Sequence, residues 1–562
     1  MSSETTIDLA LDPSPEHRRK VFVGGSAALV IAVALVSWAT IWGRRVQKNP
    51  DVKLGAAPLV GQWKFRPSIG YLMPIGLALL IIVAIPRLFA HLQTRWVVLS
   101  SAGLTTAFTA ALAGADGRVA MLAPIVHRSE YWFWLNKMPP TRQMLAKYDR
   151  YDFIVNFGTH IKGHPPGYVL ILKALDALGL AKPWIIASLS YVSAGVVAGS
   201  VLVVARRFGT AKLTRKAAPL LILAPYAVWM GTSADAIFSA LVALGAAGIA
   251  LAITSAQNRR RMTFAFLAGL SIGGALYSSW GTVTCGPILF GVLWCGAGSG
   301  RWLKQGTGHS SKPELAQGLD QTQVLPIRLA GRLRAPSVRV TKSARQHLIQ
   351  VLPIRLAGRL RAPSVRVTKS ARQRLMQGHG SQRHSSLGLM LRTLIRTLTS
   401  TVRDRMKRAF PVAVGALTGI GAIAATMTAL GYNWFAGMGL TKRLYWKGTA
   451  QFRPWKYFLV GNLGAVFIAI GIVAVVGIGV AISGSATTHR DNRWLRMVMI
   501  CALIGVITAD LSQYSKGEVE RIWLPFMPWL TVPAALLTRP RFWLVLQAAT
   551  AIGLQVMLIS KW

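Results

Sequence analysis

The sequence predicts an all-α membrane protein that crosses the bilayer many times. Its 562 residues are 52% hydrophobic, with a mean hydropathy of +0.43. Apolar runs of about 20 residues recur along most of the chain, and each is long enough to cross roughly 30 Å of hydrocarbon. The short loops between these runs are rich in Lys and Arg, as expected for a multi-pass protein with positively charged cytoplasmic loops.

Window hydropathy predicts about 13 spans, and the apolar runs justify them in order. Their predicted starts are Val21, Ile69, Arg95, Pro183, Ala217, Ala234, Thr263, Val283, Ala409, Tyr457, Trp494, Arg521 and Phe542. The first run follows the basic stretch EHRRK and is long, without a clear small-residue cleavage site. We therefore expect an uncleaved span rather than a signal peptide, in a multi-pass protein of the cytoplasmic membrane.

These runs divide the chain into four parts. The predicted parts are a cytoplasmic tail (1–20), an N-terminal transmembrane region (21–303), a basic cytoplasmic insert (304–408) and a C-terminal transmembrane region (409–562). A large outer-face loop (115–182) interrupts the first transmembrane region. The three cysteines lie in or beside apolar runs, so they predict neither a disulfide framework nor a CxxC metal pair.

The net charge of +46 does not indicate nucleic-acid binding, because 22 of the 64 basic residues lie in the insert. Within it, QVLPIRLAGRLRAPSVRVTKSARQHLI begins at Gln323, and a near-identical copy begins at Gln350. Two copies rich in Pro, Gly, Ser and Arg predict a mostly disordered loop rather than a solenoid. The following LGLMLRTLIRTLTSTVRDRMKRAF has helical periodicity and predicts a basic amphipathic helix in the inner interface.

Alternating spans leave the unusual polar segments on the outer face. These are 115–182, GTSADA, YSSWGT, the loop YNWFAGMGLTKRLYWKGTAQFRPW and ADLSQYSKGEVERIW. About nine of the 18 acidic residues lie in these segments. A solvated loop does not require such an enrichment in acidic residues, whereas a site that binds a charged or hydroxylated ligand does. One loop disagrees with the charge rule: GRRVQKNPDVKLGAAPLVGQWKFRP is basic and yet is predicted outside.

The first outer loop contains several candidate site residues. Asp116, in GADGR, can deprotonate a hydroxyl as a general base, although Asp-Gly is also a common turn pair. Arg128, in HRSEYWFW, can hold a phosphate with two hydrogen bonds, and Glu130 follows it. The adjoining aromatic residues fit an interfacial belt or a platform for sugar rings. Asp149 and Asp152 supply too few oxygens for a Ca²⁺ site.

The segment THIKGHPPG combines two histidines with two prolines. The prolines argue against a helix through the cluster, so His160 and His164 are not expected to form a helical metal pair. We expect a rigid outer loop in which both histidines overhang a cavity as hydrogen-bond donors or phosphate partners, with a purely structural turn as the alternative. The following YVLILKALDALGL is too short to span and predicts an interfacial helix.

The later outer segments add the remaining candidates. Asp235, in GTSADA, is either a functional acid at membrane depth or part of a helix cap. Arginines beside aromatic residues fit lipid phosphates, with interfacial anchoring as the alternative. The candidate substrate-binding residues in these segments are the arginines and the acids and lysine near them: Arg443, Arg453, Lys516, Glu518, Glu520 and Arg521.

Taken in order, GADGR, HRSEYW, HIKGHPPG, TSADA, FRPW and GEVERIWLPF resemble a set of actinobacterial multi-pass proteins grouped with GT-C-type glycosyltransferases. The resemblance covers roughly residues 112–526 without the insert. It implies an outer-face active site, a polyprenyl-phosphate sugar donor, and an acid in the first outer loop, for which Asp116 is the best match. Many such enzymes have adjacent acids there, whereas Gly117 follows Asp116.

The resemblance implies a transferase for cell-envelope glycans, with a glycan or lipid acceptor, surrounding membrane lipids and no nucleic acid as partners. No cofactor is required by the motifs, and a divalent metal is left open. Two alternatives stay open: a multi-pass transporter or lipid flippase, which needs midplane acids and broken helices, and a non-catalytic scaffold. Clustering of Asp116, His164, Asp235 and Glu520 around one cavity would favour the enzyme.

Overall fold

The computed structural model describes residues 15–298, 382–483 and 493–560. Contacts divide the chain into a first unit, Met1–Lys304 with Thr401–Trp562, and a second unit, Gln305–Ser400. Both copies of the repeated sequence, and the prediction that they are disordered, lie outside the described residues. The first unit therefore consists of two separate stretches of chain.

The prediction of an all-α protein with several membrane spans is confirmed. Eight described helices are long and apolar enough to cross a membrane. They are Arg19–Val46 in α1 (Pro15–Val46), α4 (Thr94–Gly114), α11 (Pro183–Phe208), α14 (Ala234–Ile253), Trp280–Gly298 in η4 and α16 (Trp280–Cys285, Gly286–Gly298), Thr399–Ala429 in α19 (Gln382–Ala429), α21 (Trp455–Ile482) and α22 (Arg493–Leu511). A ninth candidate is bent by 44° between Ile69–Val83, which contains α2 (Leu72–Val83), and α3 (Ile85–His91).

The predicted count of thirteen spans is not confirmed. Four of the predicted spans correspond to helices that are too short or too polar to qualify within the described residues. They are α12 with α13 (Ala211–Ile222, Ala227–Met230), α15 (Asn258–Leu276), α23 with α24 and η9 (Val519–Ile522, Met527–Thr531, Val532–Leu536), and α25 (Pro540–Met557). For α15, the reason is the Asn-Arg-Arg-Arg start, which lowers the hydropathy of a helix that is otherwise apolar.

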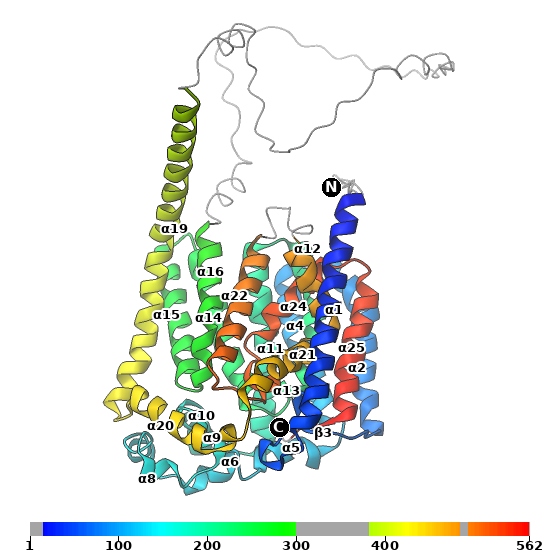
Figure 1. Cartoon of the computed structure of the whole chain (residues 1–562). Helices are drawn as coiled ribbons and strands as arrows, with labels where there is room; N and C mark the ends of the chain where they lie inside the picture. Colours follow the sequence, from blue (N-terminus) through cyan, green and yellow to red (C-terminus); the bar gives the residue numbers. More distant parts are fainter. Residues whose placement is uncertain (1–14, 299–381, 484–492, 561–562) are drawn as a thin grey trace, which may run out of the picture. The chain divides into compact units, whose positions relative to one another are not determined.

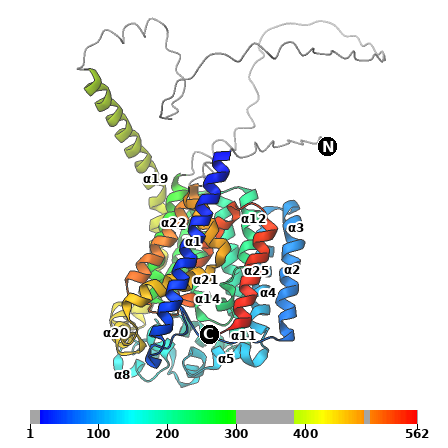
Figure 2. The ribbon, with the colours of Figure 1, turned by 45° about the vertical axis from the view of Figure 1, so that its right-hand side comes forward.

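The helices pack through small residues, as is common in membranes. α1 lies along α21, and a Cβ built at Gly24 would come within 2.6 Å of Ser483. α11 packs against α4 and α14, α14 against α15, and α16 against α22. α2 and α25 lie side by side in both views (Figures 1 and 2). The main apolar core runs through these helices, and a second apolar cluster lies among the short helices that connect them.

The segments predicted to lie on one face do gather at one end of this bundle, which we call the polar end (Figure 1). The outer loop 115–182 folds into short helices: α5 (Arg118–Val126), α6 (Tyr131–Trp134), η3 (Leu135–Lys137), α7 (Thr141–Leu145), α8 (Tyr151–Ile154), α9 (Thr159–Gly163) and α10 (Gly167–Ala177). The helix predicted after the prolines is confirmed as α10, and its place at the membrane interface stays a prediction. The preceding cluster, expected to be non-helical, begins as α9, which ends at Gly163 before both prolines.

The basic loop after α1 also belongs to the polar end. It contains η1 (Pro50–Val52) and a hairpin of β1 (Gly55–Ala56) and β2 (Leu59–Val60). β3 (Gln62–Trp63) pairs antiparallel with β4 (Leu558–Ile559). Val60 N–H donates to Glu520 at 3.1 Å, and Arg453 donates to the Val52 carbonyl at 3.0 Å. These contacts hold the loop at the end where alternation predicts it, in spite of its charge.

The amphipathic helix predicted before Ala409 is continuous with the next span. α19 runs without a break from Gln382 to Ala429, so the predicted boundary at 408/409 falls inside a helix. After it, α20 (Trp434–Lys447) and η7 (Thr449–Gln451) lead into α21.

Candidate functional site

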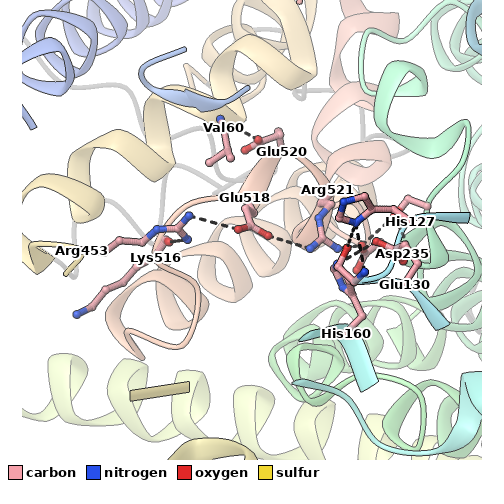
Figure 3. Close-up of polar contacts among 12 residues, drawn as sticks. Val60, His127, Glu130, His160, Asp235, Arg453, Lys516, Glu518, Glu520 and Arg521 are labelled. Atoms are coloured by element: carbon pink, nitrogen blue, oxygen red, sulfur yellow. Dashed lines mark hydrogen bonds and ion pairs between the residues drawn. The ribbon is translucent and has the colours of Figure 1, made fainter. Parts of the chain in front are cut away.

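A buried arginine forms the centre of the polar end. Arg521 lies in the one-turn helix α23, and its Nη1 is 2.6 Å from a carboxylate oxygen of Asp235. Its Nη2 is 2.9 Å from Glu518, which is also paired with Arg453 at 3.3 Å. Figure 3 shows Glu518 between the two arginines, with Asp235 beyond Arg521. Residues from α14, α23 and the loop before α21 therefore meet in one chain of ion pairs.

Local sequence explains how Asp235 reaches this arginine. Ser233 caps α14: its hydroxyl accepts a hydrogen bond from Asp235 N–H at 3.1 Å and donates to the Asp235 carboxylate at 2.9 Å. The cap holds the carboxylate at the start of the helix, with its side chain 4% exposed. The structure thus places Asp235 in the helix cap, and its role as a functional acid stays a prediction.

Glu518 has an unusual backbone that turns the chain into the site. Its φ is 62°, in the left-handed region that non-glycine residues seldom adopt. Such conformations cost roughly 1–3 kcal/mol and persist where surrounding contacts hold them. Here the two arginine pairs of Glu518 supply those contacts.

A carboxylate–imidazole pair lies next to the arginine cluster. Glu130 is the N-cap of α6, and its carboxylate is 3.0 Å from Nε2 of His160 in α9. His160 N–H donates to the Ser129 carbonyl at 3.2 Å, which fixes α9 against the start of α6. The ring of His164, at the C-terminus of α9, stacks near that of His160 with 6.3 Å between centroids.

These side chains surround a small pocket. It is lined by Glu130, Tyr131, His160, His164, Thr232, Ser233, Ala234, Asp235, Phe238 and Arg521. The Tyr131 hydroxyl and His164 Nδ1 are buried without a hydrogen-bond partner. A buried polar group without a partner is costly, so these two atoms are the ones in the pocket that can still bind a polar group. A second hollow shares Glu130 and Tyr131 and is bordered by Ile125, Trp132, Tyr168, Leu172 and Ile186.

Electrostatics fix the charge state of several groups. Burial acts to raise the pKa of Glu518, but Arg521, Arg453 and His160 outweigh it and lower the pKa to about 2. Burial lowers the pKa of His164 to about 4, so its imidazole is neutral at pH 7. Burial would also lower the pKa of Arg521, but Asp235 and Glu518 raise it well above its ordinary value. The pocket lining thus combines a positively charged Arg521 with a neutral His164.

Asp116, predicted as the catalytic acid, lies in a different network. One carboxylate oxygen is 2.5 Å from Arg66 and accepts from Gln555 at 3.2 Å, and the other accepts from the Tyr71 hydroxyl at 2.9 Å. Arg66 also donates to the carbonyls of Gln555 and Leu558. Asp116 is absent from the pocket lining. Its observed contacts join the segment before α2, the end of α4 and the last turn of α25.

Other predicted site residues lie outside the pocket. Arg128 is exposed and its carbonyl accepts from Trp134 Nε1 at 2.7 Å, while Asp152 pairs with Arg150 on the surface. Arg443 is exposed on α20. Asp149 accepts a hydrogen bond from Asn433 N–H at 3.2 Å, a different partner from the Arg150 that pairs with Asp152.

Lys516 and Glu520 are buried but face away from the pocket. Lys516 donates to the Ala450 carbonyl at 3.3 Å and lies over the Trp446 ring. Glu520 is fully buried, and one of its carboxylate oxygens accepts a hydrogen bond from Val60 N–H (Figure 3). Its second carboxylate oxygen has no hydrogen-bond partner. The expected clustering of Asp116, His164, Asp235 and Glu520 around one cavity is therefore met by His164 and Asp235 alone.

Some residues that matter here were not singled out from the sequence. Tyr131 belongs to the aromatic cluster that fits an interfacial belt or a sugar platform, and no residue pattern distinguishes it from its neighbours, although it lines the pocket. Arg66, Tyr71 and Gln555 carry no local signal, because their role depends on strand and helix ends that meet Asp116 only in the fold.

Within the described ranges, no three His, Cys, Asp or Glu side chains are grouped so as to hold a metal ion. No protein-family model, no curated protein and no solved structure matches the chain significantly. The geometry of the polar end is therefore the basis on which a function can be argued.

Proposed function

We propose that the protein is a GT-C-like membrane glycosyltransferase. It moves a sugar from a polyprenyl-phosphate donor to an acceptor hydroxyl, at the polar end on the outer face of the cytoplasmic membrane, for cell-envelope glycan synthesis. The observation that carries the proposal is the pocket, where two carboxylates, two histidines and a buried arginine converge from separate segments of a membrane helix bundle.

The chemistry of the lining supports a sugar as the ligand. Carboxylates, imidazoles and a guanidinium offer the planar hydrogen-bonding groups that bind hydroxyls. Tyr131, Tyr168 and Trp132 bring aromatic surface beside them, in the second hollow. A donor carried on a lipid fits a site at the end of membrane spans, because the lipid keeps the sugar at that depth.

In the proposed reaction, the acceptor oxygen bonds to the anomeric carbon as the bond from that carbon to the donor phosphate oxygen breaks. The hydroxyl proton passes to Glu130, which His160 orients, and the electron pair leaves with polyprenyl phosphate. Arg521 provides positive charge next to the leaving anion, with Asp235 and Glu518 holding its guanidinium in place. Direct displacement inverts the anomeric centre.

In this proposal the base is Glu130 rather than Asp116. Asp116 accepts hydrogen bonds from Arg66, Tyr71 and Gln555, which leaves its carboxylate committed to structural partners. Glu130 has the imidazole of His160 as its neighbour and lines the pocket. A carboxylate next to an imidazole can take up and pass on a proton.

The test uses the full-length protein in nanodiscs with a panel of radiolabelled polyprenyl-phosphate hexoses and pentoses. We expect lipid-dependent sugar transfer that Glu130→Gln lowers by about 10²–10⁴-fold, the usual contribution of general-base catalysis. Asp152→Asn is the matched control, because Asp152 is an exposed carboxylate on the same outer loop. Equal transfer by both variants would remove Glu130 from the reaction, and absence of transfer from every donor would reject the proposal.

A transporter or flippase remains the second candidate because one membrane helix is broken. α21 is interrupted at Gly471, where φ is 80° and ψ is 163°. Asn462 of the same helix donates a hydrogen bond to the buried carboxylate of Asp510 in α22, at 2.8 Å. Broken helices beside buried carboxylates are typical of transporters. Movement of a fluorescent lipid-linked sugar across proteoliposomes, without a new glycosidic bond, would favour this alternative.

A further inference from the structure

The helix α20 occupies a place that is fixed by its neighbours. It lies between two candidate spans, Thr399–Ala429 and Trp455–Ile482. The few residues on either side of α20 leave the chain little length to depart from the membrane surface. A 14-residue helix between two spans therefore lies in or near the headgroup layer.

One face of α20 is packed against the protein. Gly437 and Leu440 are buried, and the Trp434 indole donates to the Leu276 carbonyl at 3.1 Å. Trp434 also makes an edge contact with Trp280, with 4.7 Å between ring centroids. These contacts fix the rotation of the helix about its axis.

The opposite face is exposed, and it is both apolar and basic. Phe435 is 75% exposed and Met438 is 42% exposed. The cations Lys442, Arg443 and Lys447 are exposed on the following turns, and α20 contains no acidic residue. Large apolar side chains with cations on one exposed helix face match a membrane interface that carries negative charge.

We propose that this face of α20 binds the anionic phospholipid headgroups of the membrane that α19 and α21 cross. Phe435 and Met438 enter the boundary between headgroups and acyl chains, and Lys442, Arg443 and Lys447 contact lipid phosphates. This assigns Arg443 to the membrane surface instead of the pocket. The proposal stands on α20 alone and does not depend on sugar transfer.

The same helix contacts two segments that build the pocket. The Thr441 hydroxyl donates to the Lys162 carbonyl at 3.2 Å, in the helix that carries His160. The Tyr445 hydroxyl accepts from Lys516 N–H at 3.0 Å, just before Glu518 and Arg521. Lipid binding by α20 thereby steadies both segments, so anionic lipid is expected to order the pocket as well as the helix.

The test measures the depth of α20 in nanodiscs of neutral phosphatidylcholine with or without anionic phosphatidylglycerol. A spin label is placed at Gly439→Cys, because Gly439 is exposed and a Cβ there meets no other atom within 4 Å. Asp152→Cys, at the same end of the bundle, is the reference label. The native cysteines Cys285, Cys295 and Cys501 are first replaced by alanine, and electron paramagnetic resonance reports accessibility to oxygen and to a water-soluble nickel complex.

We expect the label at position 439 to lose nickel accessibility when anionic lipid is added, and the label at position 152 to stay accessible. The substitutions K442Q, R443Q and K447Q together should abolish most of this lipid-dependent loss, whereas the charge-preserving set K442R, R443K and K447R should retain it. The proposal would be overturned if the labels at positions 439 and 152 changed their nickel accessibility alike. It would also be overturned if the triple glutamine variant kept position 439 protected from nickel in neutral lipid, a result that would indicate a protein partner on this face.

Discussion

Arg521→Met is expected to destabilise the protein more than Asp235→Asn, because one guanidinium serves two carboxylates. Breaking a buried ion pair by removing one partner costs about 3–5 kcal/mol, since the other charge stays buried. Arg521→Met removes the positive partner of both Asp235 and Glu518, although Glu518 keeps its ion pair with Arg453 at 3.3 Å. We therefore expect the free energy of unfolding to fall by about 4 kcal/mol. Asp235→Asn keeps an acceptor for an arginine that still has Glu518, so a loss of about 2 kcal/mol is expected.

The assay is equilibrium unfolding in mixed micelles with an increasing fraction of sodium dodecyl sulfate, followed by circular dichroism. The double variant should lose less than the sum of the single losses, by about 1 kcal/mol or more, because the two side chains are in contact. Arg150→Met is the control: its pair with Asp152 is mostly exposed, so its effect should stay within about 0.5 kcal/mol. Additive losses, or a larger loss for Asp235→Asn, would refute the assignment of Arg521 as the shared partner.

Three further predictions concern other parts of the fold. Asp116→Asn should lower the free energy of unfolding by about 2 kcal/mol, since Arg66 loses its charged partner, yet leave sugar transfer measurable; a loss as large as that of Glu130→Gln would contradict it. Burial raises the pKa of Glu520 from 4.5 to about 7, so the folded state holds this proton more tightly than the unfolded state. Its contribution to stability is therefore full below about pH 4.5 and falls by about 3 kcal/mol as the pH rises to 7, and Glu520→Gln should remove that slope from unfolding measured across this range. Gly471→Ala should destabilise the protein by about 1 kcal/mol or more, because φ is 80° there, and an unfolding curve equal to wild type would argue against the break in α21.

The sequence predicted the membrane helices well because their signal is local. A span such as Trp455–Ile482 is recognisable from its own residues, without knowledge of its neighbours. Four of the thirteen predicted spans are not long or apolar enough in the structure, and in these helices arginines, prolines or glutamines interrupt the apolar run, as at the start of α15.

The candidate site could be predicted in its residue types but not in its connections. Asp235 and Arg521 were both singled out as polar residues at the ends of apolar runs, yet they are 286 positions apart and nothing local pairs them. Asp116 is predicted as a catalytic acid from its place at the start of the outer loop, but its contact with Gln555, 439 positions away, has no signal in the sequence. The strand pair β3–β4 was missed for the same reason: two residues on each side carry no periodicity to detect.

The discontinuity of the first unit has a practical consequence. Its helices come from two stretches, Met1–Lys304 and Thr401–Trp562, which contact each other along α1 with α21 and α16 with α22. Genes encoding the two stretches separately should therefore yield fragments that recognise each other in the membrane and assemble without a peptide link. Co-expression of such halves would provide a route to labelling either one selectively.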